Sequence, residues 1–308
     1  MRAHEILTDA EKARLRRRSD GIGVLYVASA WGLIFAAMWL FAIWPNPFTF
    51  LLAVMVIGGR QLGLAVLMHD AAHGILTQNR TLNNFLGRWL CAFPLGANMD
   101  AYRAYHLKHH ARTQQADDPD LVLSAPFPIT RASLRRKIIR DLTGQTFFKQ
   151  RKAQVKAALG EKGWPLGKRL AHFRERLGAT VLTNAVLFAG LALAGVWYYY
   201  FLFWLLPMAT WQQMVTRIRN IAEHAVVPDN DDPFRNARTT KTGPLTALLL
   251  APFNVNYHVE HHLFMWVPCY NLPALHRLLM RKGYGPRMEL QPGYFSMLRL
   301  SASKPASA

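Results

Sequence analysis

Two long stretches without a charged side chain constrain the fold of this chain more than any other feature. The first covers residues 21–59 and the second residues 177–216. A membrane-spanning helix needs about 20 apolar residues, so each stretch is long enough for two spans and a tight hairpin. The alternative is a helical hairpin buried in a soluble core, which is difficult to build in a chain of 308 residues. The stretches predict an all-α integral membrane protein with four transmembrane helices in two hairpins.

The distribution of positive charge predicts how these spans are oriented. The chain has a formal net charge of +19, and neither predicted hairpin tip, residues 44–47 and 197–200, contains a Lys or Arg. Every Lys and Arg except Arg60 can therefore lie on one side of the membrane, which the positive-inside rule makes the cytoplasmic side. We expect both termini on that side, a first span that is not cleaved, and a bacterial inner membrane as the location, because the chain is rich in Ala and Arg. Arg60 should face protein, a water-filled pocket or the membrane surface.

The same patterns predict a single domain, residues 1–308, organised by alternating cytosolic and membrane segments. A capping box, Thr8 to Glu11, should open a short basic helix over residues 11–19. The predicted segments are a cytosolic N-terminus (1–20), a first hairpin (21–68) with spans near 21–43 and 48–67, a cytosolic segment (69–176), a second hairpin (177–216), and a cytosolic C-terminal segment (217–308).

Two parts of the first cytosolic segment have distinct characters. Residues 85–97 are apolar but too short to span and contain Pro94, so we expect a re-entrant or interfacial segment. Residues 131–176 interleave Lys and Arg with apolar side chains, which could indicate DNA binding. Next to membrane spans, this pattern favours helices on the membrane surface.

The histidines are concentrated in three short motifs. His69 and His73 form an HxxxH box, and residues 106–110 and 258–262 each form an HxxHH box. Positions i, i+3 and i+4 share one face of a helix, so each HxxHH should aim three imidazoles one way. We expect a cytosolic helix over residues 101–112 to carry the second box. Chance clustering of histidines on a surface is the alternative, but two HxxHH boxes among twelve histidines favour a metal site.

The ligand chemistry indicates which metal is involved. An all-imidazole set with more ligands than one zinc ion uses suggests two metals, and Cys91 and Cys269 are far apart and suit packing. A zinc peptidase would have HExxH, but Asp70 occupies the place of its Glu. Iron with dioxygen remains, and nearby carboxylates should support the ligands. These are Asp70, Asp117, Asp118, Asp120, Glu223 and Glu260.

The order of these motifs around two hydrophobic hairpins resembles that of the membrane fatty acid desaturase superfamily, from residue 21 to residue 279. The flanks of the third box, residues 254–264, and the acidic turn Asp117-Asp118-Pro119-Asp120 are specific features of the resemblance. It implies a cytosolic helical cap that holds two Fe²⁺ ions. The implied ligands are His69, His73, His106, His109, His110, His224, His258, His261 and His262, with Asn220 contacting a metal through water.

The resemblance also implies a reaction. In this family the di-iron site takes two electrons from a carrier, uses O2, and removes two hydrogens from neighbouring carbons of an acyl chain. The chain lacks the His-Pro-Gly-Gly motif of a fused haem domain, so a separate ferredoxin or cytochrome b5-like donor is expected. The three-residue spacing between His69 and His73 resembles that of enzymes acting on lipid-linked chains, sphingolipids or carotenoids. We therefore expect an acyl-lipid, sphingolipid or rhizobitoxine-type desaturase.

Two alternatives remain at this point. A carotenoid or lipid hydroxylase or ketolase would use the same scaffold, and it differs in the fate of the substrate radical. A non-enzymatic membrane metal transporter would have ionisable residues within its spans, which are nearly free of them here. His4, His172 and His276 belong to no box, and we expect them to be solvated or hydrogen-bonded.

Overall fold

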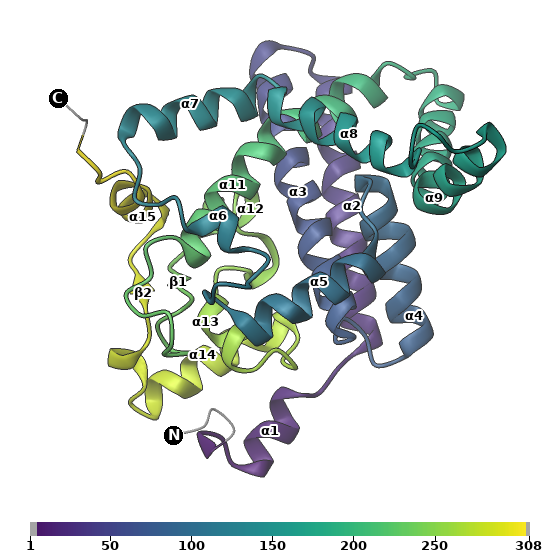
Figure 1. Ribbon diagram of the computed structural model, residues 1–308. Helices are drawn as coiled ribbons and strands as arrows, with labels where there is room; N and C mark the ends of the chain where they lie inside the picture. Colours follow the sequence, from purple (N-terminus) through teal and green to yellow (C-terminus); the bar gives the residue numbers. More distant parts are fainter. Residues whose placement is uncertain (1–4, 306–308) are drawn as a thin grey trace.

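Two long helices, α2 and α3, pack against each other at the centre of the computed structural model, which describes residues 5–305 (Figure 1). The turn between them is fixed by Asn46, whose side chain accepts hydrogen bonds from the amides of Phe48 (2.9 Å) and Thr49 (3.1 Å) and so caps α3. Three helices of the described chain are long and apolar enough to cross a membrane. They are α2 (Asp20–Ile43), α3 (Pro47–His73) and α9 (Leu166–Leu193), and the short helix α1 (Asp9–Leu15) precedes them.

The segment predicted as a fourth span is not one continuous helix. Pro207 cannot donate a backbone hydrogen bond, and Thr210, with φ −121° and ψ −86°, interrupts the helix before Trp211. Of the four transmembrane helices expected, the described residues therefore contain three that are long and apolar enough, and the third begins at Leu166 rather than residue 177. The broken segment consists of the π-helix η4 (Tyr200–Leu205), α10 (Leu206–Ala209) and α11 (Trp211–His224).

The chain between α3 and the second histidine box packs on the surface of α3. At Gly87 an added Cβ would lie 2.4 Å from the Cβ of Ala71, so the absence of a side chain permits this close approach. The region predicted as re-entrant forms a π-helix followed by a 3₁₀ turn, and the helix predicted over residues 101–112 is present. The elements are α4 (Arg80–Phe85), η2 (Leu86–Ala92), η3 (Phe93–Leu95) and α5 (Met99–Arg112).

A basic pair of helices, α7 and α8, follows along the upper edge of the view in Figure 1. The carboxylate of Asp141 on α7 is fully buried and pairs with Arg217 of α11, which fastens α7 to α11. Apolar side chains such as Phe148 are exposed between the basic residues, as expected for a membrane-surface helix. The elements are α6 (Leu121–Ser124), α7 (Arg131–Leu142) and α8 (Gln145–Ala158).

The C-terminal part of the chain folds around the third histidine box. Two residues with positive φ, Phe253 (53°) and Asn254 (61°), make the turn that leads into α13, and α14 packs on α13. Two short strands pair in parallel, with Thr239 opposite Leu290. The elements are β1 (Thr239–Thr240), α12 (Pro244–Leu249), η5 (Pro252–Asn254), α13 (His258–Leu263), η6 (Cys269–Asn271), α14 (Leu272–Arg281), η7 (Gly285–Arg287), β2 (Leu290–Gln291) and α15 (Tyr294–Ser301).

Arg60 joins the central helix α3 to this C-terminal part. Its side chain is buried, and Nη2 donates hydrogen bonds to the carbonyl oxygens of Ala247 (3.0 Å) and Leu248 at the end of α12. The carbonyl groups at a helix C-terminus carry partial negative charge, so the guanidinium is stabilised there. Arg60 thus faces protein, one of the environments expected from the sequence.

Candidate metal centre

The nine histidines predicted as metal ligands converge from four helices, α3, α5, α11 and α13. They form two neighbouring groups. Cluster A is His69, His73, His106, His110 and His261, and cluster B is His109, His224, His258 and His262.

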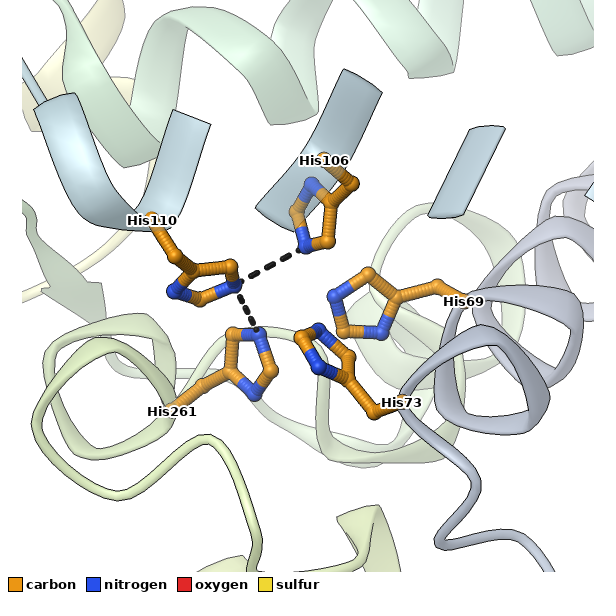
Figure 2. Close-up of side chains that lie close together, drawn as sticks. All are labelled: His69, His73, His106, His110 and His261. Carbon is orange, nitrogen blue, oxygen red and sulfur yellow. Dashed lines mark hydrogen bonds between the residues drawn. The ribbon is translucent and has the colours of Figure 1, made fainter. Parts of the chain in front are cut away.

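Cluster A is shown in Figure 2, where the five imidazoles point toward one centre. The Nε2 atom of His110 lies 2.9 Å from Nε2 of His106 and 3.0 Å from Nε2 of His261. The ligand atoms of all five lie within 4.8 Å of one another. The Nε2 atoms of His69 and His73 are buried and have no hydrogen-bond partner among the described residues. Buried polar atoms without a partner are costly, and a metal ion at this centre would satisfy them.

Neighbouring imidazole nitrogens in cluster B are also close to one another. Nε2 of His224 lies 3.2 Å from Nε2 of His109 and 2.8 Å from Nε2 of His258, and Nε2 of His262 lies 3.1 Å from Nε2 of His258. The carboxylate of Glu223 is beside this cluster, with Oε2 3.5 Å from Nε2 of His258. The sequence expectation placed Glu223 in a supporting role, whereas the structure brings its oxygen within reach of the same centre.

The tautomers implied by the surrounding contacts support metal binding at cluster B. Nδ1 of His109 donates to Oδ1 of Asp118 at 2.8 Å, and Nδ1 of His224 lies 3.4 Å from the carbonyl oxygen of Asn236. With protons on both Nδ1 atoms, the two facing Nε2 atoms present lone pairs to each other. Separations of about 3 Å suit neighbouring ligands of one ion whose metal–nitrogen bonds are roughly 2.1 Å long. The residues of both clusters fit metal ions.

The structure corrects one expectation about the HxxHH boxes. Each was expected to aim three imidazoles one way, but each divides its histidines between the clusters. His106 and His110 face cluster A while His109 faces cluster B; in the third box, His258 and His262 face cluster B while His261 faces cluster A. Residues i and i+4 are about 40° apart around a helix, whereas i+3 and i+4 are about 100° apart, so the i+3 residue diverges from its neighbour.

Three of the six predicted carboxylates contact cluster histidines through Nδ1. Asp70 lies 3.3 Å from Nδ1 of His69, Asp118 contacts His109 as described, and Asp120 lies 3.7 Å from the same nitrogen. Burial raises the pKa of Asp118, but the hydrogen bonds from His109 and from the amides of Asp120 and Gln114 outweigh it and hold this pKa below its ordinary value. Asp118 therefore remains ionised and fixes the ring of His109.

Asp117 and Glu260 have other partners. Asp117 is exposed and pairs with Arg112 at 2.7 Å, so its carboxylate contacts an arginine rather than a histidine of the clusters. Glu260 is fully buried, and it binds the hydroxyl of Thr239 and Nδ1 of His276. It therefore supports the helix that carries the third box, and its two oxygens bind Thr239 and His276 rather than a cluster histidine.

Burial sets the protonation of the site. It lowers the pKa of each of the cluster histidines His106, His110, His224, His258, His261 and His262 below the ordinary value, so these imidazoles are neutral at neutral pH. Neutral imidazole is the form that binds a metal. Burial also raises the pKa of Glu223 to about 7, against the opposing effect of Arg219, whose Nε donates to Oε1 at 2.6 Å.

Asn220 lines a small cavity beside cluster B. The cavity has a volume of about 30 Å³ and is also lined by His109, Glu223, His224 and His258. A cavity of this size can hold a water molecule. The cavity leaves room for a water molecule beside Asn220, and its contact with a metal through water stays a prediction.

Sequence reasoning missed two residues that hold the ligands in place. Tyr102 stacks on His106 with ring centroids 5.0 Å apart, and Oγ1 of Thr113 lies 3.2 Å from Nδ1 of His262. Tyr102 could have been found from helical spacing, since it is four residues before His106, whereas the partner of Thr113 lies on another helix.

The remaining histidines and cysteines have structural environments. Nδ1 of His172 contacts the carbonyl oxygen of Ala158 at 2.8 Å, and His276 binds Glu260. Both are hydrogen-bonded, as expected, whereas His4 lies outside the described residues. Cys91 and Cys269 are buried free thiols, which confirms the prediction that they serve packing.

Comparison with known proteins gives a consistent set of relatives. A family model described as fatty acid desaturase matches residues 43–291. The chain is 26% identical to dihydrorhizobitoxine desaturase of Bradyrhizobium elkanii, over 90% of this chain and 78% of that protein. It is 26% identical to beta-carotene ketolase of Paracoccus sp. (strain PC1), over 77% of this chain and 83% of that protein. It is 25% identical to the sn-1 acyl-lipid omega-3 desaturase (ferredoxin) of Synechocystis sp., over 68% of this chain and 61% of that protein.

Proposed function

The chain belongs to the fatty acid desaturase family, and on that premise we propose that it desaturates a fatty acyl chain, with O2 as co-substrate, at a histidine-ligated di-iron centre. The observation that carries this proposal is the pair of adjacent all-imidazole clusters at the end of the apolar helix α3. Dense imidazole ligation without thiolates suits iron that must change oxidation state. A site at the end of a membrane-length helix suits a substrate dissolved in the lipid.

Each cluster would hold one iron ion, with Asn220 contacting the ion of cluster B through water. Bound there, the two ions would supply oxygen activation and redox chemistry that protein side chains lack. The overall reaction consumes two electrons, two protons and one O2, removes two hydrogens from adjacent carbons, and releases two waters.

The side chains of this protein position the ligands. Asp118 and Asp70 hold the Nδ1 atoms of His109 and His69 and so direct each Nε2 toward its cluster. Burial keeps the rings neutral before a metal binds. The ligands come from four helices that are packed against one another, which keeps the geometry rigid.

The proposal extends to the substrate, the orientation of the chain in the membrane and the electron donor. We favour a lipid-linked acyl chain because the first box has three residues between its histidines. The arrangement would be four membrane segments in two hairpins, with segments 1–20, 69–176 and 217–308 cytosolic, in a bacterial inner membrane. Electrons would come from a separate ferredoxin or cytochrome b5-like carrier; one relative is named as a ferredoxin enzyme.

A hydroxylase or ketolase is the second candidate. The similarity to a beta-carotene ketolase favours it, because that relative is 26% identical over 77% of this chain, the same identity as the dihydrorhizobitoxine desaturase. Both reactions begin with removal of one hydrogen and diverge when the substrate radical loses a second hydrogen or gains an oxygen. The two candidates therefore differ in product mass.

Mass spectrometry of total lipids tests this proposal. A desaturase-null bacterial host would express the wild-type chain or the His261→Ala variant, which removes a cluster A imidazole and should abolish turnover while the protein stays in the membrane. A lipid species lacking two hydrogens, present only with the wild type, is the expected result. A species gaining one oxygen would establish the second candidate, and equal products from both chains would refute the assignment of the site.

A further inference from the structure

A basic groove lies between α1 and α14, away from the ligand clusters. It has a volume of about 410 Å³ and is lined by Arg14 and Leu15 of α1 and by residues of η6 and α14. The lining residues from η6 and α14 are Asn271, Ala274, Arg277 and Arg281. Three guanidinium groups from two separate helices therefore share one surface, and all three arginines are exposed.

The walls of this groove are held in place by specific contacts. Nδ2 of Asn271 donates to the carbonyl oxygens of Leu15 (3.0 Å) and Arg17 (3.1 Å), which ties η6 to the end of α1. Nζ of Lys282 pairs with Oε2 of Glu11 at 2.6 Å. The other acidic side chain of α1, Asp9, pairs with Lys12 at 3.1 Å, so neither carboxylate of α1 is left to neutralise the groove. The guanidinium groups of the groove make no ion pair or hydrogen bond with the part of the chain that the structure describes.

Clustered like charges without counter-charges repel one another and attract an anionic partner. The groove therefore fits an acidic surface.

A second basic surface of the protein has a different character. On α7 and α8, the arginines and lysines are interleaved with exposed apolar side chains, which suits a lipid surface. Those side chains are Ile139 (45% exposed), Leu142 (41%), Phe148 (67%) and Val155 (42%). The outer face of α14 has a single exposed apolar side chain, Met280, beside Arg277 and Arg281. A small apolar spot within a charged rim is typical of weak, transient protein–protein contacts, including those of electron-transfer partners.

The helix α14, which carries two of the three arginines of the groove, also contacts the third histidine box. His276, the neighbour of Arg277 on α14, binds the buried carboxylate of Glu260 through Nδ1. Glu260 is adjacent to His261, whose Nε2 lies 3.0 Å from Nε2 of His110 in cluster A. Figure 1 shows α13, α14 and α1 in the lower part of the molecule, with α14 packed on α13. A hydrogen bond between His276 and Glu260 therefore joins α14, the helix of the groove, to α13, the helix that carries cluster ligands.

We propose that the groove formed by Arg14, Arg277 and Arg281 is the docking surface for an acidic [2Fe–2S] ferredoxin that delivers electrons to the metal centre. This inference rests on the proposed function. Each reduced ferredoxin gives up one electron and becomes oxidised, so two docking events would supply the two electrons that the overall reaction consumes. No covalent bond forms or breaks in this step.

Binding of a carrier tests the proposal without relying on turnover. Full-length protein would be placed in phosphatidylcholine nanodiscs, and the Kd for an oxidised, acidic plant-type ferredoxin would be measured at 50 and 500 mM NaCl. In the triple variant Arg14→Glu, Arg277→Glu, Arg281→Glu, the Kd at low salt should rise at least about tenfold, and high salt should remove most of that difference. The matched control reverses three exposed arginines of α7, Arg131→Glu, Arg135→Glu and Arg136→Glu, and should stay within about threefold of the wild type.

Several results would overturn the docking surface. These are absence of ferredoxin binding by the wild type, unchanged binding by the triple variant, or equal weakening in the α7 control. Unchanged ferredoxin binding together with weakened retention of the triple variant on phosphatidylglycerol vesicles would instead place a lipid headgroup in the groove. Iron content and direct reduction by dithionite should equal those of the wild type in both variants. A failed docking result with normal lipid products would leave the proposed function intact, whereas a wild-type chain without iron would refute that function itself.

Discussion

The backbone amide of Cys269 donates a 2.8 Å hydrogen bond to Oδ2 of Asp70, a residue 199 positions earlier in the chain. The other oxygen of the same carboxylate lies 3.3 Å from Nδ1 of His69. Asp70 is buried, so these contacts join the end of α3 to η6 and hold the first ligand of cluster A. Its role is to fix the orientation of His69 while tying two distant parts of the fold together.

Replacing Asp70 with alanine should therefore weaken metal binding. Loss of such a supporting contact typically lowers metal affinity about 10- to 100-fold, and we expect this range for iron in Asp70→Ala. Competition with a chelator of known affinity measures it. Asp100→Ala is the control, because Asp100 is half-exposed and pairs with Arg88 at 2.9 Å. Equal iron affinity in the two variants would show that Asp70 does not support the site.

His276 should contribute mainly to stability. His276→Ala leaves the fully buried carboxylate of Glu260 without one of its two hydrogen-bond partners, so it should lower the free energy of unfolding by roughly 1–3 kcal/mol. Thermal unfolding in detergent measures the change. His172→Ala removes contacts to the carbonyl oxygen of Ala158 and to Nε of Arg176 but leaves no buried carboxylate without a partner, so it should have a much smaller effect. A similar loss of unfolding free energy in both variants would mean that the hydrogen bond between His276 and Glu260 stabilises the fold no more than the contacts of His172.

Gly87 permits the contact between η2 and the first box. An alanine Cβ there would lie 2.4 Å from the Cβ of Ala71 and 2.5 Å from Sδ of Met99. Overpacking of this kind costs about 1–3 kcal/mol, so Gly87→Ala should lower the unfolding temperature and disturb α3 beside His69 and His73. Gly190→Ala is the matched control, since nothing lies within 4 Å of its added Cβ. An unfolding temperature in Gly87→Ala that matches the control would contradict this packing.

Asn220 should tune turnover rather than enable it. Its side chain lines the cavity beside cluster B, and its proposed contact with a metal passes through water. We expect Asn220→Ala to reduce the yield of product several-fold while iron content stays at the wild-type value. Wild-type yield from this variant would remove Asn220 from the site, and complete loss of iron would make it a direct ligand.

Local sequence predicted the parts of this structure that local interactions determine. Thr8 and Glu11 form the expected capping box, although α1 ends at Leu15 rather than residue 19. The apolar run before His69 is one helix up to His73, as helical periodicity requires if both histidines share a face. The second box lies on α5, which begins two residues before the predicted start.

The features that the sequence did not predict depend on packing between distant segments. The division of each HxxHH box between two clusters requires the relative rotation of α5 and α13, which no single helix determines. The interruption at Thr210 lies in an apolar stretch whose composition alone resembles a span, so only Pro207 pointed to it. Likewise, the partner of Glu260 is on α14, and spacing within the third box does not reveal it.

The iron content of the full-length protein, purified from membranes of iron-supplied cells, tests the central claim most directly. The account predicts two iron ions per wild-type chain and also in His172→Ala. It predicts one ion per chain in His69→Ala/His73→Ala, which depletes cluster A, and one in His224→Ala/His258→Ala, which depletes cluster B. A single iron in the wild type, tightly bound zinc in its place, or two ions retained in both double variants would contradict the assignment of two iron sites.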